Sequence, residues 1–119
     1  MFYSKDKLEE IAEEELKKYD AEWEKEFHSE HEGYAILKEE VEEAQEAMEE
    51  VIYFAEALWR AIRGFGYEPT HDKSHFIKQI YKYSIYLASE AIQCASMAKK
   101  FERLLDIQKQ KKKEENAND

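Results

Sequence analysis

Residues 34–63 read YAILKEEVEEAQEAMEEVIYFAEALWRAIR and contain neither glycine nor proline. Apolar side chains return in this stretch every three or four positions, which is the spacing of one face of an α-helix. They form two adjacent rows: Leu37, Val41, Ala44, Met48, Ile52, Ala55 and Trp59 in the first, and Ile36, Ala47, Val51, Phe54 and Leu58 in the second. A face this wide predicts a long helix, from about Ser29 to Arg63, that contacts two neighbouring helices. A break near Tyr53 is the alternative.

Two further helices are expected on either side of this one. Residues from about Asp6 to Phe27 and from about Asp72 to Lys109 repeat apolar side chains at the same spacing, and the Gly- and Pro-containing residues 64–70 separate the last two helices. The predicted fold is an all-α, antiparallel bundle of three to four long helices, forming a single domain over residues 1–108. Residues 109–119 have almost nothing to bury and predict a disordered polar tail.

The composition excludes several classes of protein. Three glycines and one proline in 119 residues are too few for a turn-rich β fold. The net charge of −10 disfavours direct binding to nucleic acid, because such binding relies on Lys and Arg. With Cys94 as the only cysteine, no intrachain disulfide can form. No apolar run has transmembrane length, and the N-terminal segment does not resemble a signal peptide, so we expect a cytoplasmic protein without membrane contact.

Three glutamates occupy positions that the helical pattern assigns to apolar residues. Glu40 and Glu43 take consecutive places in the second row, and Glu90 interrupts the apolar row of the last helix. The i, i+3 spacing aims Glu40 and Glu43 the same way, and antiparallel packing allows Glu90 to face them. Ionised carboxylates inside a bundle cost several kcal/mol each unless they are compensated. Mg²⁺ or Mn²⁺ is the natural compensation; exposure through the flexible stems, or pairing with lysine, is the alternative.

Two blocks, HEGYAILKEEVEE at 31–43 and EAIQCASMA at 90–98, resemble the MazG-like, all-α nucleoside triphosphate pyrophosphohydrolase superfamily, in particular its short phage and prophage members. That superfamily carries an EExxE motif on one helix and an ExxD motif on the next. Glu39, Glu40 and Glu43 match the first motif, and Glu90 matches the glutamate of the second. Gln93 stands in the place of the aspartate.

The resemblance implies a Mg²⁺-dependent hydrolase, with Mn²⁺ as a possible substitute. Glu40, Glu43 and Glu90 would bind the metal, and Gln93 would offer a neutral oxygen. Glu39 and Glu40 would be catalytic, with Glu39 acting through water. A nucleoside triphosphate would be cleaved between its α and β phosphorus atoms to a nucleoside monophosphate and pyrophosphate, in a homo-oligomer whose subunits share sites.

The spacing between the two motifs differs from that of the superfamily, and a group of basic residues lies outside both motifs. Glu43 and Glu90 are 47 positions apart, which is longer than usual, and the additional length includes the aromatic-rich residues from Tyr53 to Tyr86. This stretch is either a substrate-facing insertion or additional core. Basic residues beyond Glu90 (Lys99, Lys100 and Arg103) are candidates for phosphate contacts, although basic residues late in a helix also suit its dipole.

Two other functions remain open from the sequence. Because Gln93 adds no charge and cannot serve as a base, the chain could be a catalytically impaired relative that binds metal or nucleotide. The third alternative is an acidic helical interaction protein without enzymatic activity.

Overall fold

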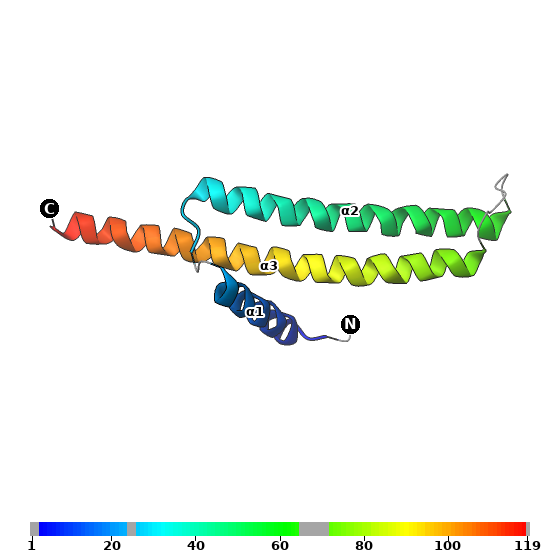
Figure 1. Cartoon of the computed structure of the whole chain (residues 1–119), viewed down its shortest axis with the longest axis horizontal. Helices are drawn as coiled ribbons and strands as arrows, with labels where there is room; N and C mark the ends of the chain where they lie inside the picture. Colours follow the sequence, from blue (N-terminus) through cyan, green and yellow to red (C-terminus); the bar gives the residue numbers. More distant parts are fainter. Residues whose placement is uncertain (1–2, 24–25, 65–71, 119) are drawn as a thin grey trace. The chain divides into compact units, whose positions relative to one another are not determined.

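The computed structural model describes residues 3–23, 26–64 and 72–118. Within these ranges the chain forms three α-helices and no strand (Figure 1): α1 (Lys5–Glu22), α2 (Glu30–Arg63) and α3 (Lys73–Asn118). The predicted all-α class is confirmed. Helix α2 runs through Tyr53 without interruption, so the described part of the chain has three helices.

Helix α1 is shorter than predicted and is capped by Ser4, just before the predicted start. The Ser4 side chain accepts a hydrogen bond from the Lys7 backbone N–H at 3.1 Å, which satisfies a free amide at the helix start. The helix ends at Glu22, where Trp23 adopts an extended conformation. The prediction that this helix continues to Phe27 is therefore wrong. Phe27 is 3% exposed and belongs to the core outside any helix.

Helices α2 and α3 begin as their local sequences predict. Ser29 accepts a hydrogen bond from the Glu32 N–H at 3.1 Å, and Asp72 accepts one from the His75 N–H at 2.9 Å. Gly64 follows α2 with a φ of 70°, the left-handed conformation that ends many helices. Of residues 64–70, which the sequence predicts to separate the two helices, residues 65–70 lie outside the described part of the chain. Helix α3 continues to Asn118, past the expected start of a disordered tail, and its side chains at 109–117 are exposed.

The contacts divide the chain into two compact units, where the sequence predicted one domain over residues 1–108. The first, called here the α1 unit, comprises Met1–Glu40 and Ile92–Asp119. Its buried core consists of Leu16, Phe27, Met97 and Leu104, with Tyr19, Ile36, Leu37 and Phe101 packed against them. Ser96 is fully buried, and its hydroxyl donates to the carbonyl of Ala12 on α1 at 3.0 Å. Helix α1 is thus attached to α3 by apolar packing and a buried hydrogen bond.

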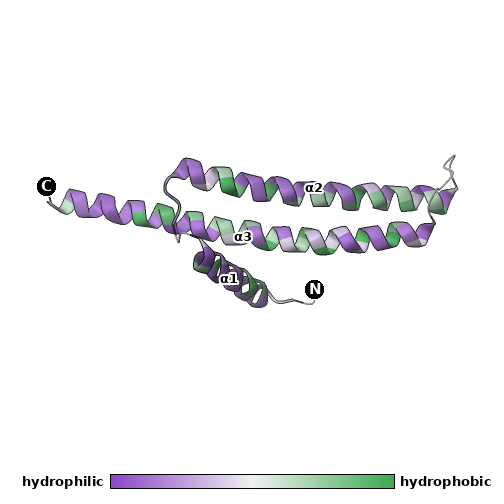
Figure 2. Ribbon diagram, viewed as in Figure 1, coloured by the Kyte–Doolittle hydropathy of each residue, from purple (hydrophilic) through white to green (hydrophobic). Residues whose placement is uncertain are grey.

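The second unit, called here the hairpin unit, is Val41–Ala91. Parts of α2 and α3 run side by side in opposite directions (Figure 1), and Phe54 stacks on Tyr83 with ring centroids 5.9 Å apart. The second apolar row of α2 is buried or half-buried here, whereas the first row is mostly exposed. Apolar and polar segments alternate along both helices (Figure 2). The large exposed apolar side chains of this unit are Val41, Met48, Ile52, Tyr53, Trp59, Ile62, Ile77, Tyr81, Ile85 and Tyr86.

None of the three described helices combines enough length and apolar character to cross a membrane.

Candidate metal centre

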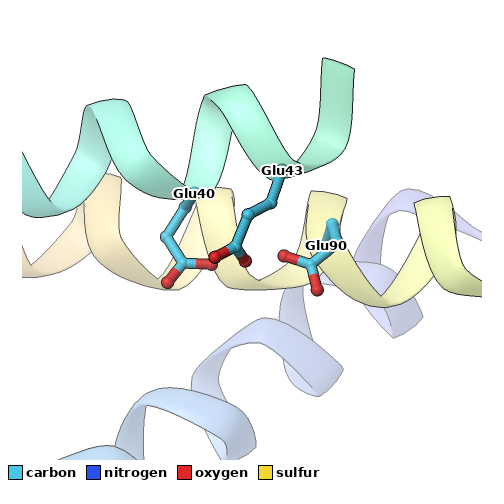
Figure 3. Close-up of side chains that lie close together, drawn as sticks. All are labelled: Glu40, Glu43 and Glu90. Carbon is cyan, nitrogen blue, oxygen red and sulfur yellow. The ribbon is translucent and has the colours of Figure 1, made fainter. Parts of the chain in front are cut away.

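Glu40, Glu43 and Glu90 lie together, as their places in the apolar rows predict. Glu43 on α2 and Glu90 on α3 belong to the hairpin unit, and Glu40 lies one turn before Glu43 on the same unbroken helix. Each residue offers one carboxylate oxygen, and these three oxygens lie within 4.8 Å of one another (Figure 3). We refer to these three residues as the carboxylate triad.

Glu90 is the most deeply buried member of the triad. It is 9% exposed, whereas Glu40 and Glu43 are half-buried. Its Oε2 atom is buried and has no hydrogen-bond partner among the described residues. An ionised carboxylate can only accept hydrogen bonds, and a buried oxygen that is left unsatisfied costs about 1–3 kcal/mol or more. Glu90 Oε2 therefore leaves a place for a hydrogen-bond donor or a cation beside it.

The phenol of Tyr86, one turn before Glu90 on α3, lies close to the Glu90 carboxylate. The negative charge of Glu90, together with burial and the charge of Glu43, raises the pKa of Tyr86 above its usual value of 10.0. The phenol therefore stays protonated and can donate to the carboxylate. Several negative groups thus act on one small region, and a single neutral hydroxyl is a weak compensation for them.

The donor set fits a hard divalent cation. All three members of the triad supply carboxylate oxygens, which are the ligands that Mg²⁺ and Mn²⁺ prefer. Mg²⁺ usually keeps several waters or substrate oxygens besides a few protein carboxylates. Three converging carboxylates with one buried, unsatisfied oxygen match that requirement, and nothing in the set distinguishes Mg²⁺ from other hard cations.

Glu39 and Gln93 lie beside the triad in sequence but are not members of it. Glu39 is exposed on α2. The Gln93 Nε2 atom donates to Glu15 Oε1 at 2.7 Å, within the α1 unit. Because a carboxylate only accepts, the nitrogen edge of the amide must face Glu15, and the carbonyl oxygen occupies the other edge. Whether that oxygen binds metal stays a prediction.

Sequence reasoning missed the role of Glu15. The residue is half-buried and precedes the buried Leu16, at the edge of the apolar face of α1. That edge position is the only signal the sequence offers, and many surface glutamates share it.

The three basic candidates lie in the α1 unit, and each has a partner there. Arg103 donates from Nη1 and Nη2 to the two carboxylate oxygens of Asp20, at 2.9 and 3.0 Å. The Lys100 ammonium lies 4.4 Å from the ring centroid of Tyr19 and 4.6 Å from that of Phe27, and burial lowers its pKa. These two contacts attach α1 and the segment that follows it to α3.

Lys99 differs from its two basic neighbours because it is exposed. Its ammonium lies 3.5 Å from Glu102, one turn further along α3. A role in phosphate binding stays a prediction for all three basic residues.

Comparison with known proteins identifies no relative. No protein-family model matches the chain, and searches of curated proteins and of solved structures return no match.

Proposed function

We propose that this chain is a Mg²⁺-dependent nucleoside triphosphate pyrophosphohydrolase of the MazG-like type, in which the carboxylate triad binds the divalent cation. The observation that supports it is the convergence of Glu40, Glu43 and Glu90 from two helices, with Glu90 Oε2 buried and unsatisfied. The same three residues match the EExxE motif and the glutamate of the second motif in the resemblance described above.

The proposed reaction converts a nucleoside triphosphate and water to a nucleoside monophosphate and pyrophosphate. A divalent cation bound at the triad supplies positive charge to the phosphate oxygens and thereby offsets the repulsion expected from a chain of net charge −10. Glu40 and Glu43 hold the metal from α2, and Glu90 holds it from α3. Glu39, exposed beside Glu40, is assigned to accept a proton from the attacking water.

The proposal includes a homo-oligomer in the cytoplasm. It is supported by the first apolar row of α2, where Val41, Met48, Ile52 and Trp59 are between 43% and 56% exposed. A two-helix unit rarely buries enough apolar surface to be stable alone, so a second copy of the same unit is the expected cover.

A pyrophosphate-release assay over a panel of deoxynucleoside and ribonucleoside triphosphates tests the activity. We expect Mg²⁺-dependent turnover of at least one substrate and its loss in Glu40→Gln and Glu90→Gln. Glu50→Gln is the matched control, because it removes the same charge from an exposed position of α2. Absence of turnover on every substrate with Mg²⁺ and with Mn²⁺, or full activity of Glu90→Gln, would contradict the proposal.

A second candidate function is a relative that binds metal and nucleotide without turnover. The hydrogen bond from Gln93 to Glu15 favours it, because an amide in the place of an aspartate adds no charge to the centre and cannot take up a proton. Titration calorimetry with Mn²⁺ and a nucleoside triphosphate separates the two. Binding without any monophosphate product identifies this candidate, and Gln93→Asp is then the variant in which to look for activity.

A further inference from the structure

An open hollow of about 400 Å³ lies on the hairpin unit, lined by Lys82, Tyr83, Ile85, Tyr86 and Ser89 of α3. Its volume falls in the range of sites that bind small molecules, which is about 300–1,000 Å³. The lining is mainly aromatic and aliphatic, with polar groups on Lys82 and Ser89 and at the hydroxyls of the two tyrosines.

Tyr86 belongs both to the hollow and to the surroundings of the carboxylate triad. Tyr86 lines the hollow, and it lies one helical turn before Glu90, whose charge raises the pKa of its phenol. At a rise of about 1.5 Å per residue, the residues from Lys82 to Glu90 span about 12 Å along the axis of α3. Along the axis of α3, Glu90 and the hollow are therefore separated by no more than about 12 Å.

The chemistry of the hollow suits a flat, uncharged ring. Tyr86 is 50% exposed, and Tyr83 is already stacked on Phe54, which holds its ring in place. The Lys82 ammonium lies 5.3 Å from the ring centroid of Tyr83 and adds a positive charge beside the hollow. Aromatic side chains stack on any of the bases, since every base has a π face.

We propose that this hollow holds the base and sugar of the nucleotide whose phosphates bind at the carboxylate triad, with Tyr86 as the stacking residue. The inference rests on the proposed function and adds the location of the base. Because the lining is mainly apolar, stacking dominates the binding of a base, and the hollow accepts purines and pyrimidines with similar affinity.

Binding measurements on the whole chain test the site without relying on turnover. The probes are Mn²⁺ alone, inorganic tripolyphosphate with Mn²⁺, and a deoxynucleoside triphosphate analogue with a non-hydrolysable α,β bridge. Ser89→Trp fills the hollow from an exposed position, and Ser84→Trp is its control, exposed on the same helix but outside the lining. Tyr86→Leu removes the ring, whereas Tyr86→Phe keeps it.

We expect Ser89→Trp and Tyr86→Leu to weaken binding of the nucleotide analogue by about 5- to 150-fold, the range measured for loss of one stacking contact. Binding of Mn²⁺ and of tripolyphosphate to Ser89→Trp should stay within about twofold of the wild type, and Ser84→Trp should keep its nucleotide affinity. Tyr86→Phe keeps the ring, so its nucleotide affinity should fall no more than its tripolyphosphate affinity.

Two results would overturn the inference while leaving the metal centre intact. One is unchanged nucleotide affinity in Ser89→Trp. The other is an equal loss of nucleotide and tripolyphosphate binding in Tyr86→Leu. A change of oligomeric state in Ser89→Trp with unchanged nucleotide affinity would instead identify the hollow as an interface between copies. If the wild type binds neither Mn²⁺ nor tripolyphosphate, the proposed function fails as well.

Discussion

At the scale of single residues, Glu90 and Lys100 are the two charged side chains that the described part of the chain buries. Lys100 lies against the faces of two aromatic rings, which attract a cation. Glu90 has one oxygen with no partner among the described residues. A buried charge with a partner supports the fold, whereas a buried charge without one suggests that a ligand completes it.

The ion pair between Asp20 and Arg103 should stabilise the α1 unit measurably. Its two hydrogen bonds are short, and the Asp20 side chain is only 12% exposed. We expect Asp20→Ala to lower the free energy of unfolding by about 1–3 kcal/mol, because the Arg103 guanidinium loses charged acceptors. Urea denaturation measures the change. The control is Glu102→Ala, which removes an exposed partner of Lys99 and should cost less than about 0.5 kcal/mol. Equal effects of the two substitutions would contradict this expectation.

Gly33 should resist substitution although it lies in a helix. A Cβ atom at this position would lie 2.7 Å from the Phe101 ring and 3.0 Å from Phe27. Alanine normally stabilises a helix relative to glycine by about 1 kcal/mol, but overpacking of this kind costs about 1–3 kcal/mol. We therefore expect Gly33→Ala to be less stable in urea, with partial recovery when Phe101→Leu is added. A Gly33→Ala variant more stable than the wild type would mean that the ring moves aside without cost.

At the scale of elements, the two apolar rows of α2 differ in how far they are exposed. The second row contains Glu40 and Glu43, and its members in the hairpin unit pack against α3, where Ala47 is 2% exposed. The first row leaves Met48, Ile52 and Trp59 exposed. The sequence predicted a helix with two neighbours. Within the hairpin unit the chain supplies one of them, which is why a second copy is part of the proposed function.

The last turns of α3 should contribute little to stability. The side chains at 109–117 are exposed, so no buried apolar surface is lost with them. We expect removal of residues 109–119 to change the free energy of unfolding by less than about 0.5 kcal/mol. By contrast, Leu104→Ala should cost about 2–5 kcal/mol, because Leu104 is 6% exposed in the core of the α1 unit. Urea melts of the two variants measure both values, and a large loss on truncation would indicate that something covers the tail.

At the scale of the whole molecule, the net charge of −10 works against a compact state, and a bound cation should relieve part of that repulsion. We expect Mn²⁺ at about 100 times its dissociation constant to add about 2.7 kcal/mol to the stability of the wild type. Thermal unfolding of the wild type and of Glu90→Gln, with NaCl at matched ionic strength as the reference, measures the part of the stabilisation that depends on the carboxylate triad. Equal stabilisation of both proteins would mean that the cation acts on the surface charge alone.

The sequence by itself determined the helical class, the limits of α2 to within a residue or two, and which three acids lie in apolar rows. These follow from periodicity and local capping, which act over a few residues. The tertiary structure alone decided which row of α2 packs, that α1 stops at Glu22, and that Gln93 donates to Glu15, a partner 78 positions away. Periodicity places a side chain around its own helix axis. Its partner depends on how the helices rotate against one another, and that is set by side chains far apart in the sequence.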